Sequence, residues 1–181
     1  MKYKSLIFIF STAVILSACG GNSSNVDVIS ATTLDCPSGS VITGVTVRLG
    51  NIIDNLALRC APINQGYPDN TTDGNNVGGT GGTLQAAFTC PVGSAVTTIS
   101  GFNGLIANPN NLGAVRVTCS DTNHTQSPNY YSNSSPGKTA YTYTCPAGQV
   151  ASSLRMNVVT NGSLRYAGYI DSVVCAVLPP V

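Results

Sequence analysis

Cysteine is the residue type whose spacing in this sequence most clearly indicates chemistry. Three of the seven cysteines open a repeated segment that begins Cys-Pro-x-Gly: Cys36, Cys90 and Cys145. These starts are 54 and 55 residues apart. Each is followed, 24 to 30 residues later, by a cysteine at the end of an alternating apolar run: Cys60, Cys119 and Cys175. A nearly constant period of this length indicates a repeated supersecondary unit.

The seventh cysteine, Cys19, follows a segment of different character. Lys2 and Lys4 precede an uncharged apolar stretch of signal-peptide length, which is too short to span a bilayer. Leu16-Ser17-Ala18-Cys19 resembles the lipobox of bacterial lipoproteins, in which cleavage precedes an acylated cysteine. We therefore predict a signal peptide at residues 1 to 18 and lipidation of Cys19. An ordinary signal peptide with a small-residue cleavage site is the alternative.

The lipobox resemblance also implies a location. Two or three acyl chains on one cysteine anchor a protein stably. Gly20 stands where the inner-membrane retention signal of many lipoproteins has Asp, which implies the outer membrane, at its periplasmic face or at the cell surface. Residues 19 to 25 then form a lipidated tether, whose small polar residues predict flexibility.

With Cys19 assigned to lipid, six cysteines remain, two in each repeat. Six cysteines allow fifteen pairings, and the repeat favours the pairing within each unit. We predict three disulfides, each closing a pair of strands: Cys36 with Cys60, Cys90 with Cys119, and Cys145 with Cys175. An exported location permits this oxidation. A metal site is a poor alternative, because no Cys-x-x-Cys pair or nearby histidine completes a tetrahedral set.

The composition predicts one all-β domain in residues 26 to 181. Glutamate is absent, and Thr, Val, Ile, Tyr, Asn and Gly dominate, which is typical of short strands joined by turns. Without Lys2 and Lys4, six basic residues face seven aspartates, so nucleic acid is not expected as a partner. The single histidine, His124, stands in a polar linker, and we predict no metal and no cofactor.

Each unit combines an outbound strand, a turn and a returning strand. We place the units at about residues 33–82, 87–138 and 142–181, and expect polar loops at residues 61–82 and 120–138. The third unit ends soon after its second cysteine. The segment at residues 26–34 is therefore predicted to supply the strand that this unit lacks.

Three units with Cys-Pro-x-Gly and a strand-end cysteine resemble the vitelline membrane outer layer protein family. The segments at residues 50–56 and 168–173 are also similar to the Gly-x-x-Asp-type strands of jacalin-related lectins. Both resemblances imply a β-prism, in which three Greek-key sheets with pseudo-threefold repeats form the faces of a triangular prism. One disulfide would staple each repeat. A β-sandwich or a three-bladed arrangement is the alternative.

The jacalin resemblance also implies a ligand site. In those lectins a sugar binds between a Gly-Gly loop and a Gly-x-x-x-Asp loop of one sheet. Gly50 and Asp54 match the second loop, and Gly78-Gly79, followed by Gly81-Gly82, matches the first. The alternative is that Asp54 merely caps a turn. Five tyrosines are candidates for stacking on a sugar ring: Tyr67, Tyr130, Tyr131, Tyr166 and Tyr169.

These features predict a binding module rather than an enzyme. No nucleophile motif is present, and the only side chains suited to acid–base chemistry near neutral pH are aspartates and one histidine. Long polar loops on a disulfide-bonded scaffold are typical of recognition. We therefore predict an outer-membrane-anchored, lectin-like or adhesion module whose partners are the membrane and a glycan or cell-surface molecule. The alternative is a structural surface-coat lipoprotein without a small ligand.

Overall fold

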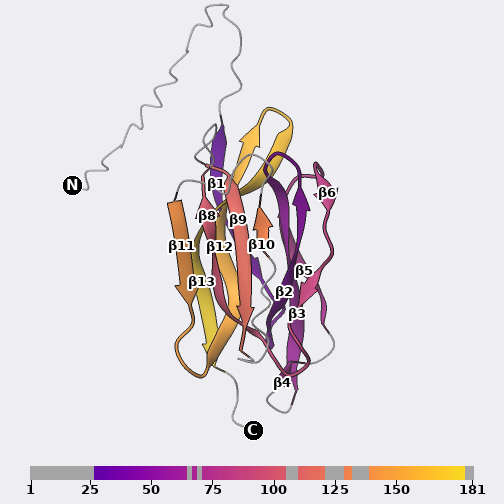
Figure 1. Ribbon diagram of the computed structural model, residues 1–181, viewed down its shortest axis with the longest axis vertical. Helices are drawn as coiled ribbons and strands as arrows, with labels where there is room; N and C mark the ends of the chain where they lie inside the picture. The colour runs from indigo at the N-terminus through magenta and orange to yellow at the C-terminus, as the bar shows by residue number, and fades with distance from the viewer. Residues whose placement is uncertain are drawn as a thin grey trace, which may run out of the picture.

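The computed structural model describes residues 27–64, 67–68, 71–104, 110–120, 129–131 and 139–177. The described residues form three antiparallel sheets that run along the long axis of the molecule (Figure 1). No described residue belongs to a helix. The all-β prediction is confirmed, as is the division into three sheets that correspond to the three repeats.

We name the sheets after the repeats that supply their central strands. Sheet I contains β2 (Ser40–Leu49) and β3 (Ile53–Asn64), flanked by β4 (Tyr67–Pro68), β5 (Thr72–Gly78), β6 (Thr83–Leu84) and β7 (Phe88–Thr89). Sheet II has the order β10 (Asn129–Tyr131), β9 (Leu112–Cys119), β8 (Val96–Asn103) and β11 (Thr139–Thr144). Sheet III has the order β1 (Val28–Asp35), β12 (Gln149–Asn161) and β13 (Leu164–Val177).

Strand β1 belongs to the sheet of the last repeat rather than to that of the first. It pairs antiparallel with β12 along its whole length, from Val28 opposite Thr160 to Asp35 opposite Ser153. The N-terminal strand thereby covers an edge of β12 that would otherwise present unpaired backbone groups.

The expectation of a structureless loop at residues 61–82 is wrong. β3 continues to Asn64, and β5 pairs with β3 between Asn55 and Cys60. Most β5 side chains are exposed, and only Val77 is buried. The strand forms because an edge strand satisfies its backbone by pairing and needs little apolar content of its own.

The three units meet on the axis of the prism, towards the end with the Cys-Pro-x-Gly turns. Val41, Ala95 and Val150 form one buried cluster, with Ile63 packed against it. Each of the three stands five residues after the first cysteine of its unit. A second, larger core cluster contains buried Val, Ile and Leu side chains of all three sheets, among them the equivalent residues Val45, Ile99 and Leu154. This repetition of equivalent positions gives the domain its pseudo-threefold axis.

Each Cys-Pro-x-Gly segment carries the chain from one sheet to the next. The proline carbonyl accepts a hydrogen bond from the amide three residues later, at 2.9 Å for Ser40, 2.9 Å for Ser94 and 3.0 Å for Gln149. The glycines have φ values of 76°, 83° and 76°. Glycine adopts such values without steric cost, which accounts for its place at the third position of this tight turn.

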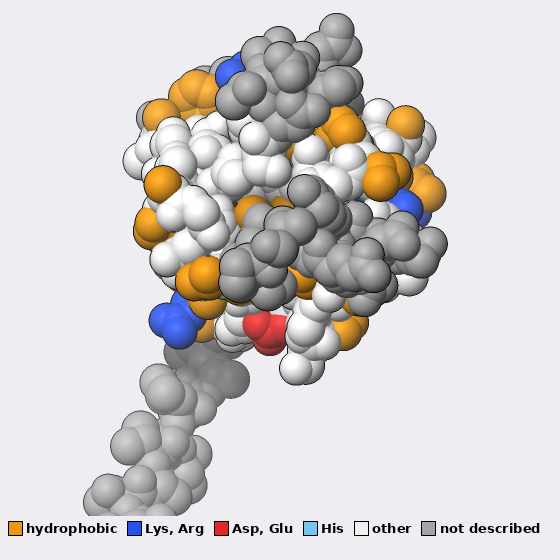
Figure 2. Space-filling view, turned by 90° about the horizontal axis from the view of Figure 1, so that it is seen from below, with side chains coloured by type: hydrophobic (Ala, Val, Ile, Leu, Met, Phe, Trp, Pro, Cys, Tyr) orange, Lys and Arg blue, Asp and Glu red, His pale blue; other side chains and the backbone are white. Residues whose placement is uncertain are grey.

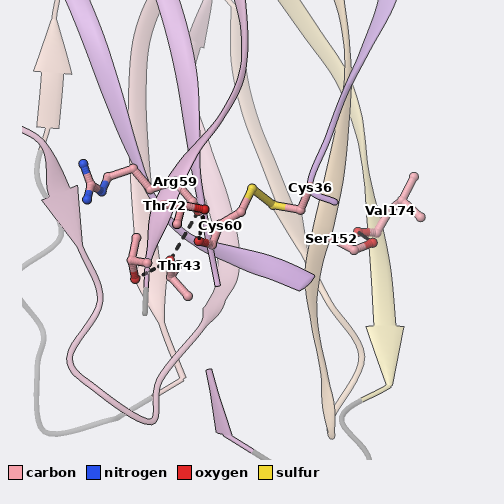
Figure 3. Close-up of a disulfide and its surroundings, with 8 residues drawn as sticks. Cys36, Thr43, Arg59, Cys60, Thr72, Ser152 and Val174 are labelled. Atoms are coloured by element: carbon pink, nitrogen blue, oxygen red, sulfur yellow. Dashed lines mark hydrogen bonds between the residues drawn. A yellow bond between two sulfur atoms is a disulfide. The ribbon is translucent and has the colours of Figure 1, made fainter. Parts of the chain in front are cut away.

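The disulfides join the predicted cysteines, but they connect neighbouring sheets instead of closing a pair of strands within one. Cys36 follows β1 of sheet III, and its partner Cys60 lies on β3 of sheet I (Figure 3). Cys90–Cys119 likewise joins sheet I to sheet II, and Cys145–Cys175 joins sheet II to sheet III. The hairpin expectation failed because the first cysteine of each unit still belongs to the preceding sheet.

A β-bulge with a hydroxyl side chain accompanies each disulfide. The bulged residue stands seven positions after the first cysteine and interrupts the register of the outbound strand: Thr43, Thr97 and Ser152. Its hydroxyl donates to the carbonyl of the residue before the second cysteine of the same unit, at 3.3, 3.3 and 3.2 Å. Its own carbonyl accepts from the amide of a first cysteine: Cys90, Cys145 and Cys36, respectively. Bulges and disulfides therefore form a closed ring of links around the prism.

Loss of one disulfide should lower the free energy of unfolding of the domain substantially. Replacing Cys90 and Cys119 together by serine removes the closure of a loop between residues 29 apart, which is worth about 3 to 4 kcal/mol of unfolding free energy. Urea unfolding of the oxidised protein measures the loss. Val92→Ser, at an exposed position in the adjoining turn, is the matched control and should change stability little. An unchanged midpoint in the double variant would contradict the structural role of the bridge.

Candidate functional site

The Asp54 carboxylate lies against glycines of two loops of sheet I. A Cβ atom built on Gly50 would be 2.8 Å from Asp54 Oδ2, and one on Gly81 would be 2.6 Å from Oδ1. Neither glycine has a positive φ that would itself require glycine. Glycine at these two positions therefore lets bare backbone approach the carboxylate, which leaves no side chain between the carboxylate and the loops.

Two further glycines, Gly78 and Gly82, allow the two loops to lie this close together because of their backbone conformations. Gly78 has a φ of 114°, and a Cβ there would be 2.0 Å from the Asp54 carbonyl oxygen. Gly82 has a φ of 64°, and its Cβ would be 2.6 Å from both Asp54 Oδ2 and the Leu49 carbonyl carbon. Larger residues at either position would force the two loops apart, since L residues rarely adopt these conformations and the space is filled.

Hydrogen bonds fix the glycine loop at both ends. The Gly79 amide donates to the Asp54 carbonyl at 2.8 Å, and Asn55 Nδ2 donates to the Gly79 carbonyl at 3.2 Å. At the other end, Arg48 Nε donates to the Gly81 carbonyl at 2.9 Å, and its Nη2 donates to the Gly82 carbonyl at 3.0 Å. The loop is thus held over the end of β2 and β3 by contacts within the protein.

The Asp54 side chain is exposed enough to act as an acceptor. Among the described residues, no group donates a hydrogen bond to its carboxylate, and the adjoining turn is closed instead by the Gly50 amide on the Ile52 carbonyl at 2.9 Å. Burial raises the pKa of Asp54 above its ordinary value of 3.8, and the Arg48 guanidinium offsets part of that rise. The charged form therefore lacks the stabilisation that a turn-capping carboxylate receives.

Sheet III contributes an aromatic side chain beside this loop. Burial raises the pKa of Tyr166, and the negative charges of Asp27 and Asp54 raise it further. Gly79 lies against the backbone of the neighbouring Arg165, because a Cβ on Gly79 would be 2.2 Å from the Arg165 carbonyl oxygen. The site is therefore formed where sheet I meets sheet III, with Tyr166 half-buried at its side.

The structure brings together four of the six predicted ligand residues: Gly50, Asp54, Gly78 and Gly79. The prediction for Tyr130 is wrong. Its side chain is only 8% exposed and its hydroxyl donates to the Ala86 carbonyl at 2.8 Å, because it covers the core between β9 and the segment before β7. The Tyr131 side chain, Cys19 and His124 lie outside the described residues.

Sequence reasoning missed Arg48 and Asn55, which position the glycine loop. Both are polar residues flanking the Gly-x-x-x-Asp segment, and their proximity in sequence to Gly50 and Asp54 was the available signal. Their partners, Gly81, Gly82 and Gly79, lie more than twenty residues away, so sequence alone could not connect them.

Asp171, the carboxylate of the similar segment in sheet III, is differently placed: it is the eighth residue of β13, whereas Asp54 is the second residue of β3. Asp171 accepts a hydrogen bond from Asn157 Nδ2 at 3.0 Å, and Asn157 itself is buried. The third unit also has Ala167 where the pattern requires the first glycine. Asp171 is therefore held by a side-chain donor, whereas Asp54 is surrounded by glycine backbone.

Comparison with known proteins gives the fold. No family model matches the sequence, and no curated protein matches it significantly. A prostate-specific WGA16 glycoprotein lectin superposes with a TM-score of 0.57 and 16% identity, over 90% of this chain and 98% of that chain. Jacalin with melibiose gives 0.52 and 10% identity, over 80% and 98%, and a mannose-specific jacalin-related lectin from Morus nigra gives 0.50 and 12%, over 86% and 99%.

The domain is therefore a jacalin-like β-prism, and the predicted fold class is confirmed. At these identities the similarity establishes the architecture. Within the part of the chain that the structure describes, no three His, Cys, Asp or Glu side chains gather as a metal site. The same residues contain no helix long and apolar enough to cross a membrane.

Asp54→Asn should leave the fold intact and should not lower its stability at neutral pH. Because the folded-state pKa of Asp54 is raised, its contribution favours folding below 3.8 and is lost as the pH rises through the raised value. The variant should therefore be as stable as the natural protein or more stable at neutral pH, and the difference should shrink below pH 3.8. Urea unfolding at the two pH values measures this. Marked destabilisation at neutral pH would instead identify Asp54 as a turn cap.

Proposed function

We propose that the protein is a lipid-anchored carbohydrate-binding module of the bacterial outer membrane, with its ligand site at Asp54. The observation that carries the proposal is the carboxylate held against glycine backbone in a β-prism whose structural neighbours are lectins. Two of those neighbours are described as bound to melibiose and to mannose. The sequence contributes the anchor, through the lipobox that ends at Cys19.

The site offers the groups that a sugar needs. A sugar hydroxyl that donates to an ionised carboxylate forms a charge-assisted hydrogen bond, roughly twice as strong as one between neutral groups. Backbone groups of the glycine loop lie beside the carboxylate and supply polar partners for a neighbouring hydroxyl. Tyr166 lies close enough for the charge of Asp54 to raise its pKa, so its ring is a candidate apolar surface for a sugar.

The geometry supports binding rather than catalysis. Glycoside hydrolysis, the reaction closest to this ligand class, uses two carboxyl groups about 5 to 10 Å apart in separate roles. At this site Asp54 stands with Arg48, glycines and Tyr166, whose pKa the charge of Asp27 also raises. Asp27 is also engaged by Asn161 Nδ2 at 2.7 Å. We therefore assign Asp54 the role of a hydrogen-bond acceptor for ligand hydroxyls.

A glycan array probed with the natural protein and its variants tests the site. Asp54→Asn should weaken binding at least about tenfold, since it removes a hydrogen bond to a charged group. Gly81→Ala should also weaken it, because the added methyl would displace the carboxylate. Asp171→Asn, which changes the carboxylate of the similar segment in sheet III, should bind like the natural protein. Full binding by Asp54→Asn would refute the site, and no binding by the natural protein would favour the structural-coat alternative.

Membrane attachment is tested separately. Cys19→Ser should release the protein from the membrane fraction into the soluble fraction, because the acyl chains would no longer be attached. Flotation of cell membranes followed by immunodetection measures the distribution. A Cys19→Ser variant that still floats with membranes would contradict lipidation at this residue and would leave the glycan prediction unaffected.

A further inference from the structure

Four large apolar side chains are exposed around the end of the domain at which the chain enters. They are Val28, Ile29, Leu84 and Leu164, with exposed fractions of 59, 42, 60 and 60%. Strand β1 begins at this end, and the β12–β13 turn and β6 lie there too (Figure 1). We call this end, defined by these four residues, the entry end. Exposed apolar side chains that gather in one region mark contact surfaces more often than isolated ones do.

Neighbouring contacts tie these side chains to one another and to the Asp54 site. Val28 pairs with Thr160, which pairs with Arg165 next to Leu164. Gly79 of the glycine loop packs against the Arg165 backbone. On the other side of the site, β6 with Leu84 follows Gly82 and pairs with Arg48 and Leu49. The exposed apolar side chains therefore flank the candidate ligand site.

Apolar exposure alone does not single out this end. Val92, Val174 and Val177 are also exposed, and they lie towards the opposite end, near the Cys-Pro-x-Gly turns. Among the described atoms visible at that end, hydrophobic side chains are scattered between polar ones (Figure 2). A second observation is needed to decide which end has a partner.

The length of the tether provides that observation. Residues 20 to 26 separate Cys19 from Asp27, and this stretch spans at most about 28 Å when fully extended. β12 contains 13 residues and alone measures about 40 Å. A tether that starts at the entry end is therefore too short to let the domain stand on its opposite end, because Asp27 would then lie farther from the bilayer than the tether can span. The entry end lies within its reach.

We propose that the entry end is a membrane-contact surface, on which Val28, Ile29, Leu84 and Leu164 rest in the bilayer that holds the acylated Cys19. This inference rests on the lipidation in the proposed function. Burial of these side chains in the interface removes apolar area from water, and the exposed Arg165 beside Leu164 matches anionic headgroups. In this orientation the Asp54 site lies beside the bilayer surface, within reach of sugars carried by membrane lipids.

The sequence contains no tryptophan, so a single introduced tryptophan reports on its own surroundings. The test uses the full lipidated protein in vesicles of phosphatidylcholine and phosphatidylglycerol, with and without brominated acyl chains. Leu164→Trp and Val28→Trp place the probe at the entry end, and Val92→Trp, at a position that is 93% exposed, places it at the opposite end. Bromine should quench and the bilayer should blue-shift the emission of the first two variants. The Val92→Trp variant should show neither effect.

Flotation of the same vesicles separates failure of the anchor from failure of the contact. A protein that floats while both entry-end probes emit as in water overturns the membrane-contact surface and leaves the lipid anchor standing. Equal quenching at Val92→Trp overturns the orientation. A protein that does not float refutes the anchor, and this inference with it. The two entry-end variants act as replicates should one of them disturb the fold, which thermal unfolding monitors.

Discussion

The ring of cross-sheet links is the constraint on which the rest of the molecule depends. Each first cysteine still belongs to one sheet while its disulfide partner lies on the next. The bulged hydroxyl residue links two successive disulfides, because its side chain bonds next to the second cysteine of one and its carbonyl bonds the first cysteine of the next. Around the prism, each disulfide is followed by a bulged residue next to its second cysteine. The carbonyl of that residue accepts from the amide of the first cysteine of the next disulfide, and three such steps close the ring. Three sheets with modest individual cores are thereby held as one body, since each bridge restricts the unfolded chain and each hydrogen bond fixes the register at the junction.

The two ends of the prism differ in how closely they follow the threefold symmetry. The Cys-Pro-x-Gly turns, the disulfides and the Val41, Ala95 and Val150 cluster occur towards one end, where equivalent residues repeat in all three units. At the entry end the threefold pattern breaks down. Within the part of the chain that the structure describes, Asp54 of sheet I lies against a glycine loop and accepts no hydrogen bond at its carboxylate, whereas Asp171 of sheet III is held by Asn157. The symmetric contacts at one end stabilise the fold. The candidate site at Asp54 lies at the other end, where the three units differ.

Much of this architecture was predictable because it depends on local spacing. The repeat period, the positions of the cysteines and the truncated third unit specify three equivalent sheets and a strand borrowed from the N-terminus. Which sheets each disulfide joins was not predictable, because it depends on whether the first cysteine lies before or after the turn into the next sheet. The Cys36 amide still bonds the Ser152 carbonyl of β12, so Cys36 lies before that turn. The seven-residue offset of Thr43, Thr97 and Ser152 was present in the sequence, but hydroxyl residues are too common in β proteins for this offset to indicate a bulge.

The candidate site likewise contains residues that could be predicted from the sequence and residues that could not. Gly50 and Asp54 are separated by one turn, so their proximity follows from the sequence, whereas Arg48 and Tyr166 reach the site only through folding. Tyr130 was misassigned because polar linkers usually expose their aromatic side chains, yet here β10 adds to the edge of sheet II and places the ring over the core. An aromatic residue in a linker can therefore be evaluated only once the pairing of its backbone is known.

The raised pKa of Asp54 connects the scaffold to the site. A carboxylate that folding leaves partly desolvated and without a hydrogen-bond donor among the described residues disfavours the folded state at neutral pH. Such a residue persists where its role lies outside stability, and perturbed groups of this kind concentrate at functional sites. Each disulfide of the ring contributes about 3 to 4 kcal/mol to the free energy of unfolding. The ring at one end of the prism is thus compatible with a carboxylate at the other end that accepts no hydrogen bond from the described residues, which is the group that the proposed site offers to a ligand hydroxyl.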